Sequence, residues 1–344
     1  MLKNTLLLSS FISLGATASP IQIDSCEQLL NLEDNTNSYY VLLQNIDCSG
    51  FIHTEPKSFA GNFDGNGYAI SNLTISAAKG DVGLFSIINA GEIKNLTISN
   101  FQINTQDKKA KTVGALAGLQ KGGLIKNVTI TDSEISNAVG SWAVGLLVGR
   151  ADSAMLQDIV VQHSALSSST DSNNIGGVSG WLREGAGANK IKVREGAGAY
   201  NIKVNDVKIT VKNSGLNSVG GIFGNVEQTK LELLEIADSS LKRNDLGKSG
   251  RNGLLVGQLD KSTITNGSVV NVVHNLVLGK YNGIAAGTIL QSADDEVLLD
   301  SISHNDVDNS LQWHYVNPKE TYRTNNLYLN LSNESTLPPS VCRF

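Results

Sequence analysis

A six-residue apolar block framed by glycine recurs along the chain. The seven copies are VGLFSI at Val82, VGALAG at Val113, VGLLVG at Val144, IGGVSG at Ile175, VGGIFG at Val219, NGLLVG at Asn252 and NGIAAG at Asn282. The steps between copies are 31, 31, 31, 44, 33 and 30 residues. A nearly fixed period of this size is typical of an array of stacked units, in which each unit packs on its neighbours.

A second signature, an Asn or Asp followed by alternating apolar and polar residues, recurs between the glycine-framed blocks. In Asn95-Leu-Thr-Ile-Ser-Asn100, Leu96 and Ile98 lie on one side of the chain and Thr97 on the other. This period of two predicts β-strands, and the frequent glycine and β-branched residues argue against a solenoid of helices. We therefore expect about three short strands per repeat and an all-β fold, a single parallel β-helix (β-solenoid) of about seven to eight coils.

The one long step in the period contains a tandem duplication. Residues Arg183–Val193 read REGAGANKIKV and are followed directly by REGAGAYNIKV at Arg194–Val204. Removing one 11-residue copy reduces the 44-residue step to 33 and restores the period. We expect one copy to leave the coil as a loop, either as a grafted binding loop or as a tolerated surface insertion.

Two columns of polar residues appear when the repeats are aligned. The first comprises Asn95, Asn127, Asp158, Asn201 and Asn266, with Leu233 in the remaining repeat. The second comprises Asn100, Asp132, His163, Asp206, Asp238 and Asn271. Asn and Asp tolerate left-handed backbone and bond to their own turns, and stacked amides bond along a solenoid axis. Both columns therefore favour structural ladders at the corners of the coil.

The first 18 residues have the composition of a secretory signal peptide. Lys3 provides the positive start, Leu6–Leu14 is a short apolar run, and Ala16-Thr-Ala18 offers small residues at the cleavage site. The apolar run is too short to span a bilayer. We expect an exported protein that is secreted, at the cell surface or in the periplasm, with no membrane insertion.

The rest of the chain divides by the presence of the repeat. We expect an N-terminal cap at 19–58, the parallel β-helix with its inserted duplication near 183–204 at 59–300, and a C-terminal cap or tail at 301–344. An open end of a β-helix is an exposed sheet edge, so the array needs caps. A short leucine-rich segment at 29–32 favours a helix over the first coil.

The cysteines and the net charge indicate the redox environment and the kind of partner that we expect. Cys26 and Cys48 flank the first elements of the mature chain, and in an exported protein they favour a disulfide that ties down the end of the array. Cys342 is left over, and its role stays open. The net charge is −5, or −6 once Lys3 is removed, which argues against nucleic acid as a partner.

One segment gives a family resemblance. Phe59-Ala-Gly-Asn-Phe-Asp-Gly-Asn-Gly-Tyr-Ala-Ile-Ser-Asn-Leu-Thr-Ile75, followed by the glycine-framed blocks, resembles the GLUG-repeat proteins of bacteria. The resemblance covers about residues 45–286. It implies a secreted or surface β-solenoid, found in adhesin-like proteins and beside the protease domain of some immunoglobulin A-cleaving enzymes. It carries no catalytic residue over to this chain, which departs from the family in its short length, its duplication and its deviating later repeats.

The sequence contains none of the common catalytic or metal-binding motifs. It has no H-E-x-x-H, G-x-S-x-G, P-loop or C-x-x-C, and its five histidines lack ligand spacing, so we expect no metal and no cofactor. An alternative catalytic site would use Asp206 and Asp238, with carboxylates about 5 Å apart on neighbouring coils, and His163 one coil below. A ladder explains all six residues of the second column, whereas a catalytic pair explains only two of them.

An adhesin-like role, binding an extended glycan or a cell-surface protein, is the leading functional hypothesis. The candidate contact residues lie near coil corners or in the duplicated segment and are Trp142, Trp181, Tyr200, Arg183 and Arg194. The alternative is a polysaccharide-degrading enzyme, which would need Asp206 or Asp238 for product formation. A structural component of an extracellular matrix is a third hypothesis, distinguished by concentration-dependent assembly.

Overall fold

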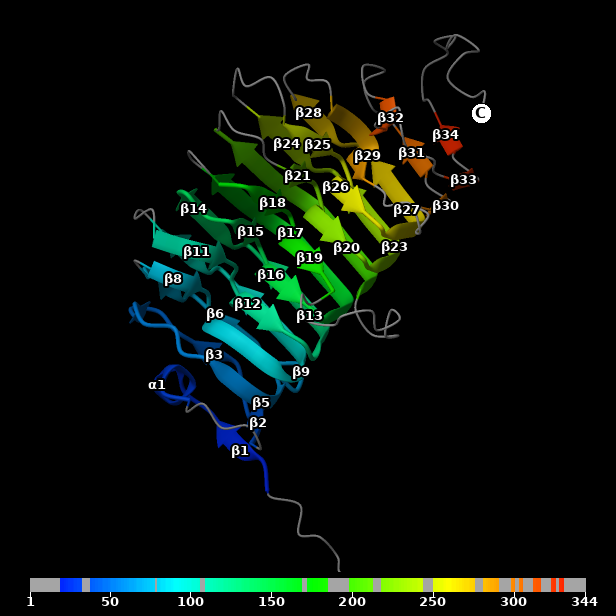
Figure 1. The fold of residues 1–344 in the computed structure, drawn as a ribbon. Coiled ribbons are helices and arrows are strands. Elements are labelled where there is room, and N and C mark those ends of the chain that lie inside the picture. The colour runs from blue at the N-terminus through cyan, green and yellow to red at the C-terminus, as the bar shows by residue number, and fades with distance from the viewer. Residues whose placement is uncertain are drawn as a thin grey trace, which may run out of the picture.

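The chain folds into a stack of parallel β-strand coils in a computed structural model (Figure 1). The coils rise as one elongated body from the N-terminal end, drawn in blue, to the C-terminal end, drawn in red. The predicted signal peptide, Arg194 and Cys342 lie outside the described residues. Those are 19–32, 38–77, 79–105, 109–168, 172–184, 198–212, 218–243, 250–275, 281–290, 298–300, 303–305, 312–316, 323–325 and 328–330.

Three ladders of strands run along the axis of the stack. The first ladder contains β8 (Lys79–Val82), β11 (Lys109–Val113), β15 (Ala143–Gly145), β18 (Asn174–Gly176), β21 (Ser218–Gly220), β25 (Arg251–Gly253) and β29 (Tyr281–Leu290). The second contains β9 (Phe85–Ser99), β12 (Ala117–Lys121), β16 (Val148–Asp152), β19 (Ser179–Arg183), β22 (Phe223–Glu227), β26 (Val256–Asp260) and again β29. The third contains β9, β13 (Leu124–Thr131), β17 (Met155–Ser168), β20 (Gly198–Val211), β23 (Lys230–Ala237), β27 (Thr263–Val270) and β30 (Leu298–Asp300).

Shorter strands complete the coils. Some continue the third ladder past its second corner, namely β10 (Gln102–Asn104), β14 (Glu134–Ala138), β24 (Ser240–Arg243) and β28 (Val273–Asn275). The N-terminal strands are β1 (Ile21–Ile23), β2 (Tyr39–Leu42), β3 (Ile46–Asp47), β4 (Ile52–His53), β5 (Phe59–Asp64), β6 (Ala69–Ser71) and β7 (Thr74–Ile75). The C-terminal strands are β31 (Ser303–Asn305), β32 (Gln312–Val316), β33 (Arg323–Asn325) and β34 (Tyr328–Asn330).

The glycine-framed blocks stack in a single register. The first residues of the seven copies form one column along the first ladder, Val82, Val113, Val144, Ile175, Val219, Asn252 and Asn282, each paired with the next. The predicted parallel β-solenoid is confirmed, but it has about six turns and not the seven to eight coils that we expected. The predicted three strands per repeat are seen most clearly in the coil made of β15, β16 and β17.

Glycine is required in these blocks because two ladders approach each other closely there. A Cβ atom on Gly145 would lie 2.5 Å from the Cα of Ser179, and one on Gly149 would lie 2.5 Å from the backbone nitrogen of Val113. Real Cβ atoms do not reach such distances, so a larger residue would push the first and second ladders apart.

The core follows the predicted alternation. Leu96 and Ile98 of β9 are buried, and in register with Leu96 lie Val128, Ile159, Ile202 and Leu234, which are also buried. Full burial of such side chains contributes roughly 1.5–3 kcal/mol each. The interior is therefore a continuous apolar column in the coils whose side chains are described, from Ile23 to Ile289.

Both predicted polar columns form left-handed corners. The φ angles of the first column are 54° at Asn95, 52° at Asn127, 53° at Asp158, 54° at Asn201, 55° at Leu233 and 57° at Asn266. Those of the second are 52° at Asn100, 52° at Asp132, 46° at His163, 49° at Asp206, 46° at Asp238 and 49° at Asn271. Amides bond along the axis, as where Asn127 Nδ2 donates to Asn95 Oδ1 at 2.9 Å. Two further bonds along the axis join Asn201 to Asp158 and Asn271 to Asp238, so both columns form left-handed corners with side-chain bonds at some of their steps.

A third left-handed column was not predicted. It lies between the second and third ladders and has φ of 62° at Ala90, 74° at Gly122, 50° at Ser153, 54° at Gln228 and 46° at Lys261. These residue types share no preference for left-handed backbone, apart from glycine. The corner is held here by strand pairing on both sides and is not encoded locally.

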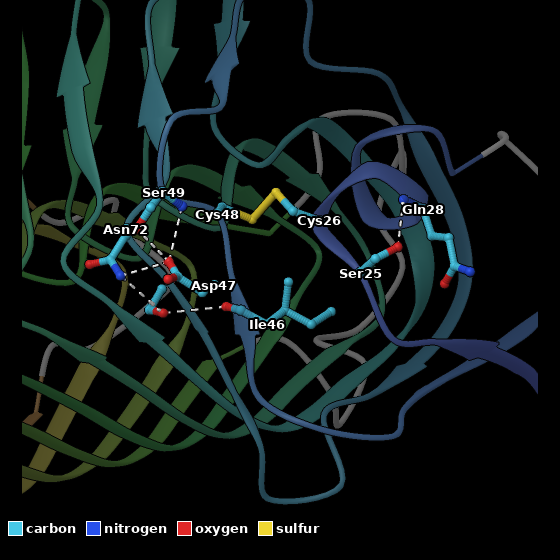
Figure 2. The surroundings of a disulfide bond; sticks show 9 residues. Ser25, Cys26, Gln28, Ile46, Asp47, Cys48, Ser49 and Asn72 are labelled. Carbon is cyan, nitrogen blue, oxygen red and sulfur yellow. Dashed lines mark hydrogen bonds between the residues drawn. A yellow bond between two sulfur atoms is a disulfide. The ribbon is translucent and has the colours of Figure 1, made fainter.

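An aspartate begins each of the two polar ladders. Asp64 accepts hydrogen bonds from Asn95 Nδ2 at 3.0 Å, from the Asn66 backbone N–H at 2.8 Å and from the Tyr39 hydroxyl at 3.1 Å. Burial acts to raise the pKa of Asp64, but these hydrogen bonds outweigh it and the pKa is lowered. Asp47 begins the other ladder and accepts from Ser49 and from Asn72 Nδ2 (Figure 2). The hydrogen bond from the Ser49 hydroxyl is the main reason that the pKa of Asp47 is lowered.

The N-terminal end carries the predicted helix and the predicted disulfide. Helix α1 (Cys26–Leu30) begins after Ser25, whose side chain accepts from the Gln28 backbone N–H, and it buries Leu29. Cys26 and Cys48 form a disulfide that ties α1 to the loop after β3 (Figure 2). The segment 19–58 also contributes strands, because β1 pairs with β2 and β2 with β5.

Parallel pairing also continues beyond residue 300. β31 pairs with β27, and β34 pairs with β31, so part of the segment 301–344 adds strands to the stack. Within the described ranges, no helix has the length and hydropathy that a membrane span requires.

Candidate ligand-binding site

The duplicated segment leaves the solenoid at one corner, which we call the loop-base corner and define by Arg150, Asp152, Trp181, Arg183 and Tyr200. In the register, Asp152 pairs with Arg183 and Met155 with Gly198. Two residues separate Asp152 from Met155, and fourteen separate Arg183 from Gly198, so the extra residues are confined to this corner. Residues 185–197 lie outside the described part of the chain.

Four side chains on the second ladder meet beside the insertion. Arg150 and Asp152 project from β16, and their register partners on β19 are Trp181 and Arg183. Asp152 accepts from Arg150 at two points, Nε to Oδ1 and Nη2 to Oδ2, both at 2.8 Å. The same Oδ1 atom accepts from Arg183 Nε at 2.8 Å. One carboxylate thus holds two guanidinium groups from adjacent coils, in the geometry that gives the strongest ion pairs.

Both guanidinium groups also contact the indole ring of Trp181. The Cζ atom of Arg150 lies 4.7 Å from the ring centroid and that of Arg183 lies 4.9 Å from it, within the range of cation–π attraction. Trp181 Nε1 is buried without a hydrogen-bond partner in the described part of the molecule. The ring is therefore already engaged by two cations, which reduces the area it can offer to a sugar.

Arg183 has donors to spare. Its guanidinium group donates to Asp152 through Nε alone, and no other hydrogen bond of this group is seen among the described residues. Its side chain is 20% exposed, and that of Asp152 is 16% exposed. The terminal amino groups of Arg183 can therefore donate to a ligand while Nε stays anchored, and partial desolvation strengthens such a contact.

Tyr200 lies on the other side of the insertion. It belongs to β20 on the third ladder, where Gln157 and Glu232 pair with it from the coils below and above. The side chain is 39% exposed, and Gly198, two residues earlier on the same strand, presents no side chain beside it. An exposed aromatic ring among polar side chains is a common platform for the apolar face of a sugar.

The predicted contact residues do not all converge. Trp181, Arg183 and Tyr200 flank the loop-base corner, whereas Trp142 precedes β15 on the first ladder. There its backbone N–H donates to the Lys111 carbonyl at 2.7 Å, and the side chain is 53% exposed. Arg194 falls within the residues that the structure leaves undescribed.

The alternative catalytic residues occupy successive coils of the second polar column. Around them Gln162 pairs with Asn205 and Asn205 with Ala237, which sets His163, Asp206 and Asp238 side by side along the axis. All three are exposed and have left-handed backbone. Asp238 accepts from Asn271 Nδ2 at 2.7 Å, as a ladder member does. No group of three His, Cys, Asp or Glu side chains suited to a metal ion occurs among the described residues.

The sequence reasoning missed Arg150 and Asp152. The signal was available, because both lie 31 residues before Trp181 and Arg183, which is the length of the repeat. Residues one period apart on the same ladder become neighbours on adjacent coils. Reading each candidate contact residue together with the residues one period before and after it would have found the pair.

Comparison with known proteins identifies partial relatives. No family model matches the chain. Halomucin of Haloquadratum walsbyi is 31% identical over 182 residues, which cover 47% of this chain and 2% of that protein. A candidate glycine-rich membrane protein of Evansella cellulosilytica is 29% identical over 130 residues, which cover 34% of this chain and 15% of that protein. The chain thus spans a small part of either relative's length.

Two solved structures align with most of the chain at low similarity. A candidate immunoglobulin A1 protease from Bacteroides ovatus is 18% identical, with a TM-score of 0.47 over 92% of this chain and 86% of that chain. A polygalacturonase from Erwinia carotovora is 12% identical, with a TM-score of 0.29 over 92% of this chain and 99% of that chain. Likenesses this distant give no information about the activity of the present chain.

Proposed function

We propose that this protein is an exported, adhesin-like β-solenoid of the GLUG-repeat type that binds a glycan at the loop-base corner. The observation that carries the proposal is the anchored Arg183 guanidinium on one side of the inserted segment and the exposed Tyr200 ring on the other. Both side chains project from strands paired on two sides, so the site needs little ordering when it binds.

The chemistry of the corner suits a sugar. A pyranose has an apolar face that packs on an aromatic ring and a rim of hydroxyl groups that both donate and accept. Tyr200 supplies the ring, Arg183 supplies donors, and the Glu232 carboxylate beside Tyr200 supplies an acceptor. A cell-surface protein that binds at the same corner is the other class of ligand that we expect.

The test is a glycan panel applied to the purified mature chain. We expect retention of one glycan class, weakened about tenfold or more in Tyr200→Ala and in Arg183→Gln, because each change removes a central contact. Phe51→Ala is the matched control, since Phe51 is a similarly exposed aromatic residue (40% against 39%) at the N-terminal end. Retention that both variants leave intact, or no retention of any glycan, would contradict the proposal.

A further inference from the structure

A cleft lies near the N-terminal end of the solenoid, away from the loop-base corner. Its volume is about 880 Å³, and its lining includes Glu55, Pro56, Lys79, Asp81, Ile87 and Lys111. Thr54, Ser76 and Ser86 are also part of the lining. The volume falls within the range of small-molecule sites and is large enough for a short oligosaccharide.

A β-bulge aims one side chain at this cleft. Between β8 and β11, Ala110 pairs with Gly80 and Thr112 pairs with Asp81, so Lys111 is an extra residue in the ladder. Next to it, the Thr112 hydroxyl donates to Asp81 Oδ1 at 2.8 Å and fixes that carboxylate. Bulges are common beside functional sites, where they redirect a side chain.

The cleft holds charges that the described residues do not pair. Neither the Lys79 nor the Lys111 ammonium group lies within 4.0 Å of a carboxylate among the described ion pairs, and Glu55 and Asp81 make no ion pair there either. The two lysines reach the cleft from adjacent coils, on β8 and β11. The lining thus carries two cations and two anions. Their charges sum to zero, but no ion pair joins them among the described residues.

This arrangement defines the ligand by its chemistry. An anionic group on the ligand would meet Lys79 and Lys111, and ligand hydroxyls would donate to Glu55 and Asp81. Ile87 and Pro56 offer apolar surface for a sugar face. Trp142 is not part of the lining, but it lies one coil beyond Lys111, its backbone N–H donates to the Lys111 carbonyl, and its side chain is exposed. A hydroxyl-rich ligand with a carboxylate satisfies all of these groups.

We propose that this cleft is a second binding site, which takes oligosaccharides of uronic-acid type. It shares no residue with the loop-base corner and lies on earlier coils of the stack. The two lysines bind the uronate carboxylate, Glu55 and Asp81 accept from the ring hydroxyls, and Trp142 extends the site toward the next sugar.

The experiment is calorimetric titration of the mature chain with oligogalacturonate, oligoguluronate and hyaluronan fragments, each beside its methyl-esterified form. We expect at least one acidic probe to bind the unaltered protein. Its methyl ester should bind at least tenfold more weakly, and the acid itself should bind the Lys111→Gln variant at least tenfold more weakly. Lys230→Gln is the control, because Lys230 is exposed on β23, far along the third ladder, and should bind like the unaltered protein.

Three outcomes would overturn the proposal. The first is equal binding of an acid and its ester, and the second is no binding of any acidic probe. The third is binding that survives Lys111→Gln but is lost in Arg183→Gln, which would place the acidic ligand at the loop-base corner. Because Lys111 is exposed, loss of the fold is not expected in the variant, and a thermal melt checks this.

Discussion

Left-handed backbone at the corners is the feature that single residues control most directly. In the first polar column every member but one is Asn or Asp, and the exception is Leu233, with φ of 55°. A branched apolar residue carries a cost of about 1–2 kcal/mol in this conformation, because its Cβ approaches the following carbonyl oxygen. Leu233 is therefore a local weak point in an otherwise favourable column.

We predict that Leu233→Asn raises the free energy of unfolding by about 1 kcal/mol. Asn relieves the backbone cost and restores an amide between Asn201 and Asn266 in the ladder. Leu43→Asn is the matched control, because Leu43 is similarly exposed (42% against 38%) but has no left-handed backbone. Denaturant unfolding measures the stability of both variants. If Leu233→Asn proves no more stable than Leu43→Asn, the prediction is contradicted.

The aspartate that begins the first polar ladder predicts a dependence on acid. The pKa of Asp64 is lowered in the fold from the ordinary 3.8. Its ionised form therefore stabilises the fold above pH 3.8, and this contribution is lost as pH falls through the lowered value.

We expect Asp64→Asn to lower the free energy of unfolding by about 1 kcal/mol or less near neutral pH, because solvent screens this partly exposed carboxylate. The difference from the unaltered protein should shrink below about pH 4. Urea unfolding at a series of pH values measures it, and a difference that stays constant down to about pH 3 would refute the assignment.

At the scale of the strand ladder, burial decides which ion pairs between coils contribute to the stability of the fold. The Asp152–Arg183 pair has side chains that are 16% and 20% exposed, whereas the Lys203–Glu235 pair, at 3.4 Å, has side chains that are 50% and 45% exposed. Water screens the second pair strongly and the first pair much less.

Removing each acid in turn should separate the two cases. We predict that Asp152→Asn lowers the free energy of unfolding by about 2 kcal/mol, since two guanidinium groups lose their partner. Glu235→Gln should cost less than about 0.5 kcal/mol. Equal losses in the two variants, measured by denaturant unfolding, would show that the cluster beside Trp181 contributes no more than a surface pair.

The elements that could be predicted from sequence are those encoded locally. Alternation around Leu96 and the left-handed preference of Asn95 fixed strand, corner and register together, because each coil repeats the same local preferences. The third left-handed column could not be foreseen, since Ala90, Ser153 and Lys261 lack such a preference and are held by their neighbours. The bulge at Lys111 was equally hidden, because nothing in the repeat marks one extra residue.

At the scale of the whole molecule, the described coils form one continuous stack with distinct surfaces. About six turns share one apolar interior and one register. The duplicated segment changes a single corner and leaves the pairing of both flanking strands intact. Site residues were harder to predict than the fold. Arg150 and Trp181 become neighbours only because their coils stack. Trp142 and Tyr200 were both predicted as contact residues, but they lie on different ladders.

The central proposal is that the molecule binds glycans and that its second polar column is a structural ladder. The most direct test is incubation of the mature chain with each retained glycan, followed by mass spectrometry of glycan length. We predict retention with unchanged length, also in Asp206→Asn and Asp238→Asn, because both residues serve as corner residues of a ladder. Shortened glycans that disappear in either variant would contradict the account and assign the second polar column to catalysis.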